Sequence, residues 1–470
     1  MVVSAAQGWV QESVTKSIDL GGSVSISTSV IEAAPAGDFV AGDGANVPFL
    51  LYYSRTEANG LSYVRASVRA AADAPDTRKE SVPAEATVLG TLPDDPDTIA
   101  YEVLLPRSLI GPREPITMRI ATGFLHQAEP LPREVPQGEP QYLTWTGDIA
   151  LRSPYTTRSG TVVVRTPSLK ILSYTETDQV SRSGRSITYG PYKEVPVHTG
   201  ATPVLTGRVH YEYQKAVAAF VRFDRHVEVS HWGDNMATAD SILLRNDGAK
   251  LKGHFNRASY MQRMMVHQMP DTPGILHVLP YMVPGAAEDV YYVDSVGNVS
   301  TSEFGPAPHR GTLPRRLDLR PRYPLLGGWN YSFTVGWNEP LESQGIARRV
   351  SAAGALRVRV AVPFLAAPNG VAVDHARLRV VLPEGAADVS VSLPFEMDSE
   401  EIINYPLYLD TIGRTAVVLE RAKCTSRHQG IVYIDYSLPL LQHLRKPLAV
   451  SVAALLVFAA AFLLRRQLEE

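Results

Sequence analysis

Cysteine is nearly absent from this sequence, and an excess of positive charge is missing too. One cysteine, Cys424, stands among 470 residues, which excludes an intrachain disulfide framework and a metal site built from cysteines. The 45 lysines and arginines are outnumbered by 48 aspartates and glutamates, so the formal net charge is −3. Proteins that bind nucleic acid need a basic surface. We therefore expect no nucleic-acid partner.

Catalytic motifs are also missing. The sequence contains no H-E-x-x-H zinc helix, no G-x-S-x-G nucleophile elbow and no phosphate-binding P-loop. His226 and His231 lie five residues apart in a strand-like stretch, where that spacing puts them on opposite faces. Cys424 lies near Arg421 and His428, whose charges would favour its thiolate, but no base with an orienting partner accompanies it. We predict no catalytic residue, no metal site and no cofactor.

The first twenty residues do not form a signal peptide. They have neither a basic start nor a continuous apolar run of the required length. Two interpretations stay open. The chain has lost or lacks its signal, or it is a tail-anchored protein whose bulk lies in the cytosol.

One long apolar run is present, near the C-terminal end. The 18 residues Pro447–Leu464 carry no charge, and a pair of basic residues stands on each side of them. As a helix this run would extend about 27 Å, close to the hydrocarbon thickness of a bilayer. The sequence predicts one transmembrane helix over 447–464, followed by a short tail over 465–470. The positive charges on the two flanks nearly balance, so they do not decide on which side of the membrane the tail lies; a cytosolic tail follows only from the resemblance described below.

The rest of the chain reads as short strands separated by Gly- and Pro-bearing turns. In Val24–Ile31, for example, Val24, Ile26 and Val30 alternate with serines, which is typical of a half-buried strand. The same signals predict strands at Phe49–Tyr53, Tyr63–Val68, Tyr101–Leu105, Ile116–Ile120, Thr161–Arg165, Ile171–Tyr174, Val209–Tyr213, Leu356–Val362, Arg377–Leu382, Val389–Leu393, Thr415–Leu419 and Ile431–Tyr436.

Helix signals are rare before the apolar run. The best one covers Ser259–Gln268 and stops before a proline, whereas the four prolines of Gln127–Gln141 predict an extended loop. Many short strands with frequent turns favour β-sandwich modules in tandem. We predict a mostly β protein with one domain over 1–215 and a second over 216–440, the boundary lying between Gln214 and Arg225.

Two N-glycosylation sequons are present, Asn298-Val299-Ser300 and Asn330-Tyr331-Ser332. Asn298 follows a glycine in a turn-like setting, where a side chain is readily exposed. Asn330 follows Gly327-Gly328-Trp329, a tighter setting. Asn298 is therefore the first candidate acceptor and Asn330 the second.

Several long motifs, in one order, carry a family resemblance. They run from Val227 to Arg414 and include VEVSHWGDN, NDGAKLKGHFNR, DVYYVDSVGNVSTS, RPRYPLLGGWNYSFTVGWNEP, LPEGA and YLDTIGR, with weaker echoes in SPYTT and YGPYKEVP. The chain resembles ribophorin I, the alpha subunit of the eukaryotic oligosaccharyltransferase complex. The first 140 residues match it in strand character more than in wording.

The resemblance implies a type I membrane protein of the endoplasmic reticulum, with two tandem luminal β-rich domains before a single membrane helix. It also implies a non-catalytic subunit. The complex transfers a preassembled oligosaccharide from dolichyl diphosphate to asparagine in nascent chains, and another subunit performs the transfer. The implied partners are the catalytic and other subunits and the lipid bilayer, with nascent polypeptide and the protein-translocation channel as further candidates. The family's glycosylated asparagine maps onto Asn298.

The tail over 465–470 departs from the family pattern, because animal members continue well into the cytosol. A ribosome-docking role associated with that extension therefore does not carry over. Two alternatives stay open from the residues themselves. One is a membrane-anchored β-sandwich scaffold in the cytosol, and the other resembles an M1 aminopeptidase domain without its catalytic zinc helix.

Overall fold

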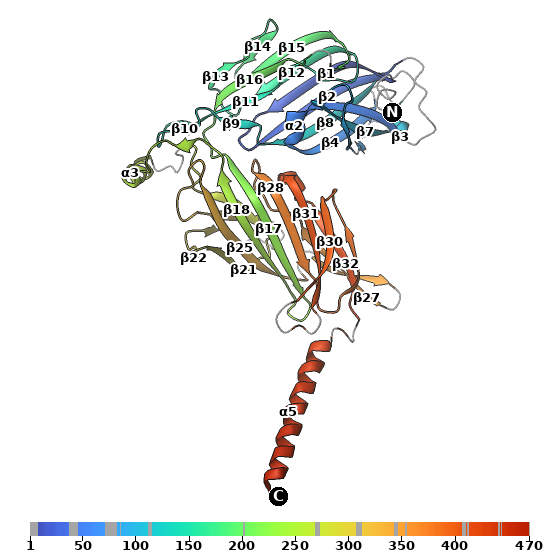
Figure 1. Ribbon diagram of the computed structural model, residues 1–470, viewed down its shortest axis with the longest axis vertical. Helices are drawn as coiled ribbons and strands as arrows, with labels where there is room; N and C mark the ends of the chain where they lie inside the picture. The colour runs from blue at the N-terminus through green and yellow to red at the C-terminus, as the bar shows by residue number, and fades with distance from the viewer. Residues whose placement is uncertain are drawn as a thin grey trace.

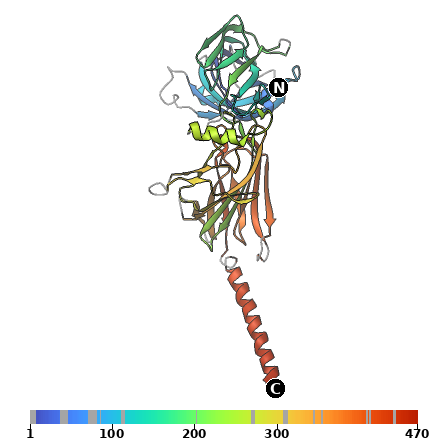
Figure 2. The ribbon, with the colours of Figure 1, turned by 90° about the vertical axis from the view of Figure 1, so that its left-hand side faces the viewer.

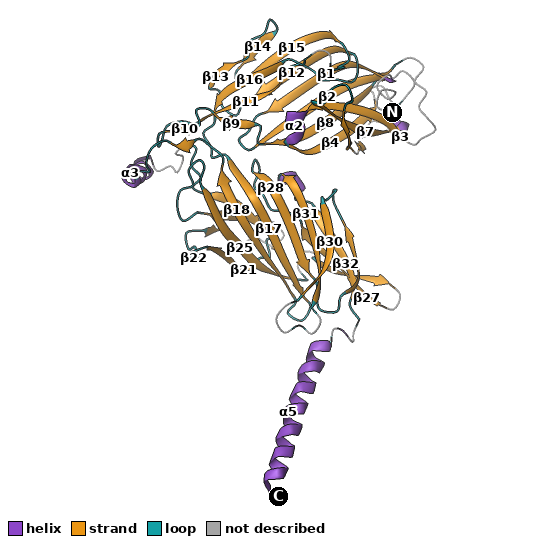
Figure 3. Ribbon diagram, in the orientation of Figure 1, coloured by secondary structure: helices purple, strands orange, loops and turns teal. Residues whose placement is uncertain are grey.

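A computed structural model gives the architecture of the chain (Figures 1 and 3). It describes residues 8–36, 46–70, 82–84, 86–110, 115–200, 203–267, 273–306, 313–342, 346–352, 355–406, 410, 413–439, 442 and 444–469. Strands dominate, and one long helix ends the chain. The prediction of a mostly β protein with a C-terminal apolar helix is therefore confirmed. Most of the motif YLDTIGR lies outside the described residues.

The N-terminal part comprises strands β1 to β16. Its largest sheet has eight strands in the order β14 (Val180–Ser183), β15 (Ser186–Val195), β12 (Thr157–Arg165), β1 (Trp9–Asp19), β2 (Val24–Pro35), β8 (Ile116–Leu125), β4 (Leu61–Ala70), β5 (Val82–Ala84). Two smaller sheets complete it: β3 (Asn46–Ser54), β7 (Thr98–Pro106), β6 (Ala86–Thr91), and β13 (Ile171–Tyr174), β16 (Thr206–Glu212), β11 (Tyr142–Asp148), β9 (Ala128–Pro130). Buried aromatic side chains such as Phe49 and Trp145 fill the two cores of this part.

Strand β2 turns the opposite face inward from the one its apolar residues suggest. Ser25 and Ser27 are buried, whereas Ile26 and Val30 are more than a third exposed. Ser25 Oγ donates to Gln127 Oε1 at 2.8 Å, and the buried Trp145 Nε1 lies 3.4 Å from the same oxygen. The interior at this point is a hydrogen-bonded polar cluster, so Ser25 belongs inside it.

The C-terminal part comprises the strands from β17 to β32. Its eight-stranded sheet has the order β22 (Gly297–Asn298), β21 (Glu288–Asp294), β25 (Asn330–Pro340), β18 (Asn235–Asn246), β17 (Ala218–Ser230), β28 (Ala372–Val381), β31 (Arg414–Cys424), β30 (Ser399–Tyr405). Two smaller sheets cover its inner face and share one hydrophobic core with it: β20 (Leu279–Val283), β24 (Arg315–Leu319), β23 (Glu303–Phe304), and β26 (Ala347–Ala352), β27 (Ala355–Pro363), β32 (Ile431–Ser437), β29 (Ala387–Ser392).

The two parts meet between β16 and β17. Among the described residues, the one sheet that joins them is the short pair of β10 (Glu134–Val135) and β19 (Lys250–Leu251). The expected boundary interval ran to Arg225, yet β17 begins at Ala218 and its residues are largely buried. The chain therefore passes from one part to the other over Tyr213–Val217. That 1–215 and 216–440 fold as separate domains stays a prediction.

Helices are few in the described residues. Two short 3-10 turns lie at Arg107–Leu109 and Ser426–His428, and α2 (Arg55–Asn59) is one turn with a capping box from Ser54. Helix α3 (Arg257–His267) covers most of the predicted Ser259–Gln268, whose last residue lies outside the described residues. The predicted loop Gln127–Gln141 holds β9 and β10.

Helix α5 (Arg445–Glu469) leaves the end of the C-terminal part and extends away from the β-structure (Figures 1 and 2). Its segment Pro447–Gln467 has the length and hydropathy of a membrane span, and none of it is buried in the protein. At 1.5 Å per residue this segment is about 31 Å long, which matches a bilayer core. The helix continues for five residues past Leu464, to Glu469, so most of the predicted tail is helical.

A buried ion pair sits in the core of the C-terminal part. Arg225 on β17 donates to both carboxylate oxygens of Asp240 on β18, each at 2.7 Å, and both side chains are at most 3% exposed. Arg225 also donates to Pro363 O at 2.8 Å, and the Tyr281 hydroxyl donates to Asp240. This network ties three sheets together. Because the network is desolvated, removing one member leaves the charge of its partner buried and uncompensated.

Replacing Asp240 by alanine should lower the free energy of unfolding of the C-terminal part by about 3–5 kcal/mol, because the Arg225 guanidinium stays buried without its counter-ion. Chemical denaturation followed by near-UV circular dichroism measures this. Glu303→Ala is the matched control, since its ion pair with Arg320 is exposed at 72% and 52%. We expect a cost below about 1 kcal/mol there. Equal costs for the two variants would contradict this account of the core.

Candidate functional site

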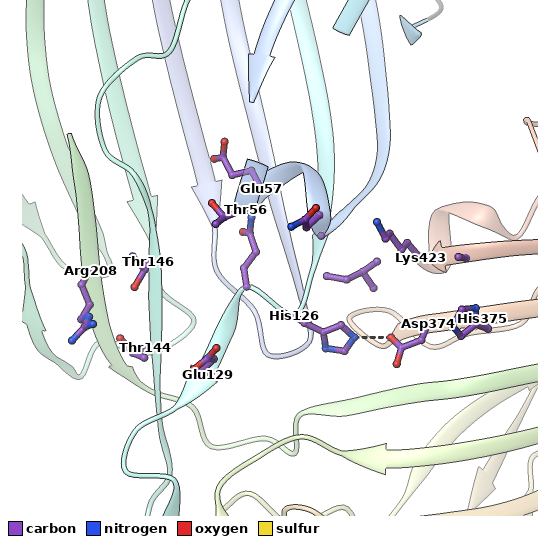
Figure 4. A pocket seen from close by; sticks show the side chains of 15 residues that line it. Thr56, Glu57, His126, Glu129, Thr144, Thr146, Arg208, Asp374, His375 and Lys423 are labelled. Carbon is purple, nitrogen blue, oxygen red and sulfur yellow. Dashed lines mark hydrogen bonds and ion pairs between the residues drawn. The ribbon is translucent and has the colours of Figure 1, made fainter. Parts of the chain in front are cut away.

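A cleft of about 690 Å³ lies where the two parts of the chain meet (Figure 4). The N-terminal part contributes α2, the turn between β8 and β9, and residues of β11 and β16, and the C-terminal part contributes the facing residues of β28 and β31. Most of the lining side chains are polar or charged, among them Thr56, Glu57, Asn59, His126, Gln127, Glu129, Thr144, Thr146, Arg208, Asp374, His375 and Lys423. The cleft is therefore a polar surface between two bodies of β-structure.

His126 is the side chain that crosses this cleft. It follows β8 with a φ of 54°, a left-handed conformation that projects the imidazole toward the C-terminal part (Figure 4). Its Nε2 lies 2.6 Å from Asp374 Oδ1 on β28, and its Nδ1 lies 3.5 Å from Asp247 Oδ2. Arg245 binds Asp247 and lies 3.7 Å from Asp374. The hydrogen bond with Asp374, more than the other charges, raises the pKa of His126.

A buried hydrogen-bond cluster lies beside the cleft. Ser23 Oγ lies 2.6 Å from Ala218 O and 2.9 Å from Gly370 O, and it accepts the backbone N–H of Ala372 at 3.1 Å. One hydroxyl of the N-terminal part thus contacts the first residues of β17 and β28, which are parallel neighbours. Buried apolar contacts surround it, from Leu125 to Ala219 and Ala372. We call Ser23, His126 and these partners the junction.

Further polar contacts extend the junction along its edge. Gln141 Nε2 donates to Lys215 O at 2.6 Å, and its Oε1 accepts the Ala249 N–H at 3.1 Å. The Gln137 side chain exchanges hydrogen bonds with the backbone of Asn256, just before α3. These contacts are distributed over several elements. They hold the two parts as neighbours without a continuous sheet.

Glu57 and Cys424, an acidic and a nucleophilic group beside the cleft, are held within the protein. Glu57 is buried, accepts the Ser54 N–H at 3.2 Å and pairs with Lys16 Nζ at 3.2 Å. Burial raises the pKa of the Cys424 thiol to about 12, outweighing the effect of Arg421. The expectation that nearby cations favour its thiolate is therefore wrong, because desolvation dominates. In the part of the chain that the structure describes, no group of three potential metal ligands occurs.

The two histidines considered as a metal pair have separate partners. His226 Nε2 contacts Glu228 Oε1 at 3.1 Å on β17, whereas His231 Nε2 contacts the Tyr436 hydroxyl at 2.6 Å on β32. Each ring also packs against a tyrosine, His226 on Tyr405 and His231 on Tyr436. Both are used in packing and hydrogen bonding within the C-terminal part.

Asn298 lies in an exposed hairpin. Strands β21 and β22 pair through Val293 and Asn298, and the turn between them is held by Asp294 Oδ1, which accepts two backbone N–H groups. Arg322 donates to both Asp294 oxygens and lowers the pKa of that carboxyl. The Asn298 side chain is exposed on this hairpin. Access and a fixed backbone suit an acceptor asparagine.

Asn330 is the first residue of β25 and lies opposite Arg245 of β18. Its side chain is exposed, but its carbonyl accepts the Tyr323 hydroxyl at 2.8 Å and aromatic residues crowd the same end of the strand. This agrees with the tighter setting expected from its sequence neighbours. Whether either asparagine carries a glycan stays a prediction.

The residues of the junction were missed by sequence reasoning. Ser23 lies 195 residues from Ala218, and His126 lies 248 residues from Asp374. Neither stands in a motif. A positive φ at His126 leaves no sequence mark either, since histidine is only moderately enriched there.

The raised pKa of His126 predicts a pH-dependent junction. Protonated His126 stabilises the folded state fully below the unfolded pKa of about 6.5, and this contribution is lost as the pH rises through the raised folded pKa. The difference in unfolding free energy between wild type and His126→Asn should therefore be larger at pH 6 than at pH 9. Asparagine tolerates the positive φ.

Urea unfolding at both pH values provides the measurement. His254→Asn, which replaces an exposed histidine that makes none of the contacts of His126, is the matched control. A His126→Asn difference that does not change with pH would contradict the assignment of Asp374 as its charged partner.

Comparison with known proteins places the whole chain in one family. The family model for ribophorin I matches residues 9–465. The dolichyl-diphosphooligosaccharide–protein glycosyltransferase subunit 1B of Arabidopsis thaliana is 32% identical over 369 residues, covering 78% of this chain and 75% of the relative. The subunit 1B of Oryza sativa is 31% identical, covering 87% and 82%. The subunit 1 of Caenorhabditis elegans is 29% identical, covering 96% and 71%.

Solved structures add only a faint likeness. Yeast LTA4 hydrolase aligns over 43% of this chain and 29% of its own, with 8% identity and a TM-score of 0.27. At that level it supports no conclusion about this chain. The family model and the relatives together are decisive: the chain belongs to the ribophorin I family.

Proposed function

We propose that this chain is a subunit of a dolichyl-diphosphooligosaccharide–protein glycosyltransferase in the membrane of the endoplasmic reticulum. The observation that carries the proposal is the family match over residues 9–465, together with relatives of about 30% identity that are named as subunit 1 of that enzyme. Helix α5 provides the single membrane span. The other subunits of the complex are its partners.

In this proposal the chain contributes architecture and performs no glycosyl transfer itself. Three groups at or beside the cleft support this role, because each is bound or buried within the chain. His126 is held by Asp374 and Asp247, Glu57 is bound to Lys16, and Cys424 is a buried thiol. Groups engaged in this way stabilise a shape. A catalytic acid or nucleophile has to reach a substrate.

We further propose that the β-structure lies in the lumen, where it can meet acceptor polypeptides near the catalytic subunit. The exposed Asn298 on its hairpin fits this orientation, because the sequon is modified only on the luminal side. Nascent polypeptide and the protein-translocation channel are proposed as neighbours on the same grounds. The C-terminal end of α5 would then face the cytosol.

Depletion and complementation test the architectural role. In membranes depleted of this chain, glycosylation of a reporter with several sequons should fall and should recover with the wild-type chain. The purified chain alone should transfer no oligosaccharide from dolichyl diphosphate to an acceptor peptide. The matched control is a chain in which residues 447–467 are replaced by polyleucine of equal length. This variant keeps a membrane anchor and the whole β-structure, so it separates anchoring from any effect of the native helix sequence. Transfer by the purified chain, or full glycosylation without it, would contradict the proposal.

A further inference from the structure

The layer that covers the large C-terminal sheet is divided. The β20–β24–β23 sheet and the β26–β27–β32–β29 sheet share no strand pairing, and a pocket of about 400 Å³ opens along the seam between them. Strand β20 forms one wall, and the residues that follow β27, up to Pro368, form the other. The floor is the inner face of β17, β18 and β25. The seam therefore leads from the surface into the core.

A buried carboxylate lies on this floor. Glu339 is 3% exposed, and its Oε2 accepts the Trp337 indole N–H at 3.1 Å. Among the described residues, its other oxygen, Oε1, has no hydrogen-bond partner. Burial raises the pKa of this carboxyl. A carboxylate in such a setting gains from any donor that enters the pocket.

Arg225 lowers the pKa of Glu339, but less than burial raises it, and it makes no ion pair with Glu339 among the described contacts. Arg225 also faces the pocket, but it donates to both oxygens of Asp240 and to Pro363 O. The Arg225–Asp240 pair has no net charge. When Glu339 is ionised, the floor of the pocket therefore carries a net charge of one negative unit. The pocket thus has the electrostatic character of a cation site.

The walls and the rim select for an apolar body. Met236, Val283, Leu365 and Ala367 are buried side chains that line the pocket. Five prolines, Pro280, Pro284, Pro314, Pro363 and Pro368, line it as well. Proline has a carbonyl but no backbone N–H, so these residues can accept hydrogen bonds and cannot donate one. The prolines therefore add acceptors and no donors to the lining.

We propose that this pocket binds a primary alkylammonium group, with the ammonium on Glu339 Oε1 and the methylenes against Met236 and Leu365. Its volume lies in the range of small-ligand pockets. The same chemistry occurs in a free alkylamine and in the lysine side chain of a partner polypeptide. This binding site is independent of the transferase role proposed above.

The test is ligand-observed NMR with the full chain in lipid nanodiscs, titrated with n-pentylammonium. Saturable binding is expected, at least ten-fold weaker in Glu339→Gln, which keeps an acceptor for Trp337. The exposed Glu401→Gln should bind like wild type. The neutral probe 1-pentanol should bind at least ten-fold more weakly than the amine. Equal binding in wild type and Glu339→Gln, or equal binding of amine and alcohol, would overturn the proposal.

A second variant ensures that the test does not rest on Glu339→Gln alone. Ala366→Phe fills the pocket from its wall and leaves Glu339 in place, so it should also abolish binding, and undiminished binding would overturn the proposal. Near-UV circular dichroism reports whether each variant is folded.

Comparing Nα-acetyl-lysine methylamide with its norleucine counterpart tests whether the ammonium group belongs to a lysine side chain of a polypeptide or to a free alkylamine. Tighter binding of the lysine compound than of pentylammonium identifies a polypeptide side chain, and the reverse identifies a free amine.

Discussion

The junction between the two parts is the constraint on which the remaining structure depends. Ser23 is 1% exposed, and its hydroxyl lies against the first residues of β17 and β28. Those two strands are central in the C-terminal sheet. A single buried hydroxyl therefore aligns the N-terminal part with the middle of the C-terminal part. Loss of one of these three hydrogen bonds would lower the stability more than loss of an exposed hydrogen bond of the same kind, because Ser23 is buried.

The junction and α5 together explain how the chain can act through its shape. The N-terminal part sits on one end of the C-terminal part, and the membrane helix leaves from the opposite end (Figure 2). Anything bound to the N-terminal part is thus held at a distance from the bilayer set by the long strands of the C-terminal sheet. His126 adds a pH-sensitive contact to this arrangement, since its partners are two carboxylates. Such a subunit would therefore act by holding its N-terminal part at a fixed distance from the membrane, near the catalytic subunit.

Local patterns in the sequence predicted much of the fold. Ile171–Tyr174 is a strand over the expected residues, and α5 includes the whole of the predicted 447–464. Strand β1 was missed, because the first twenty residues were considered only as a leader. The face of β2 was assigned from hydrophobicity alone, and the polar cluster around Gln127 reversed it. Local signals give strands; they do not give the polar contacts inside a core.

The junction and the pocket of Glu339 could not be predicted from the sequence, for a different reason. The contacts of Ser23 with Ala218 and of His126 with Asp374 join segments more than a hundred residues apart, and the pocket is lined by separate segments spread from Arg225 to Ile431. Each member is an ordinary residue in its own segment. Only the pairing of β17 with β28, and of β18 with β25, brings them together. Asn298 is the opposite case, because its sequon and its turn are local and its exposure followed from them.

The central proposal is that the two β-rich parts lie in the lumen of the endoplasmic reticulum and are anchored in the membrane by the single helix α5. Endoglycosidase H treatment of the chain from native membranes tests it most directly. The account predicts a faster-migrating band after treatment, with the shift lost in Asn298→Gln. A native chain whose mobility does not change would contradict it and would favour a cytosolic, tail-anchored scaffold.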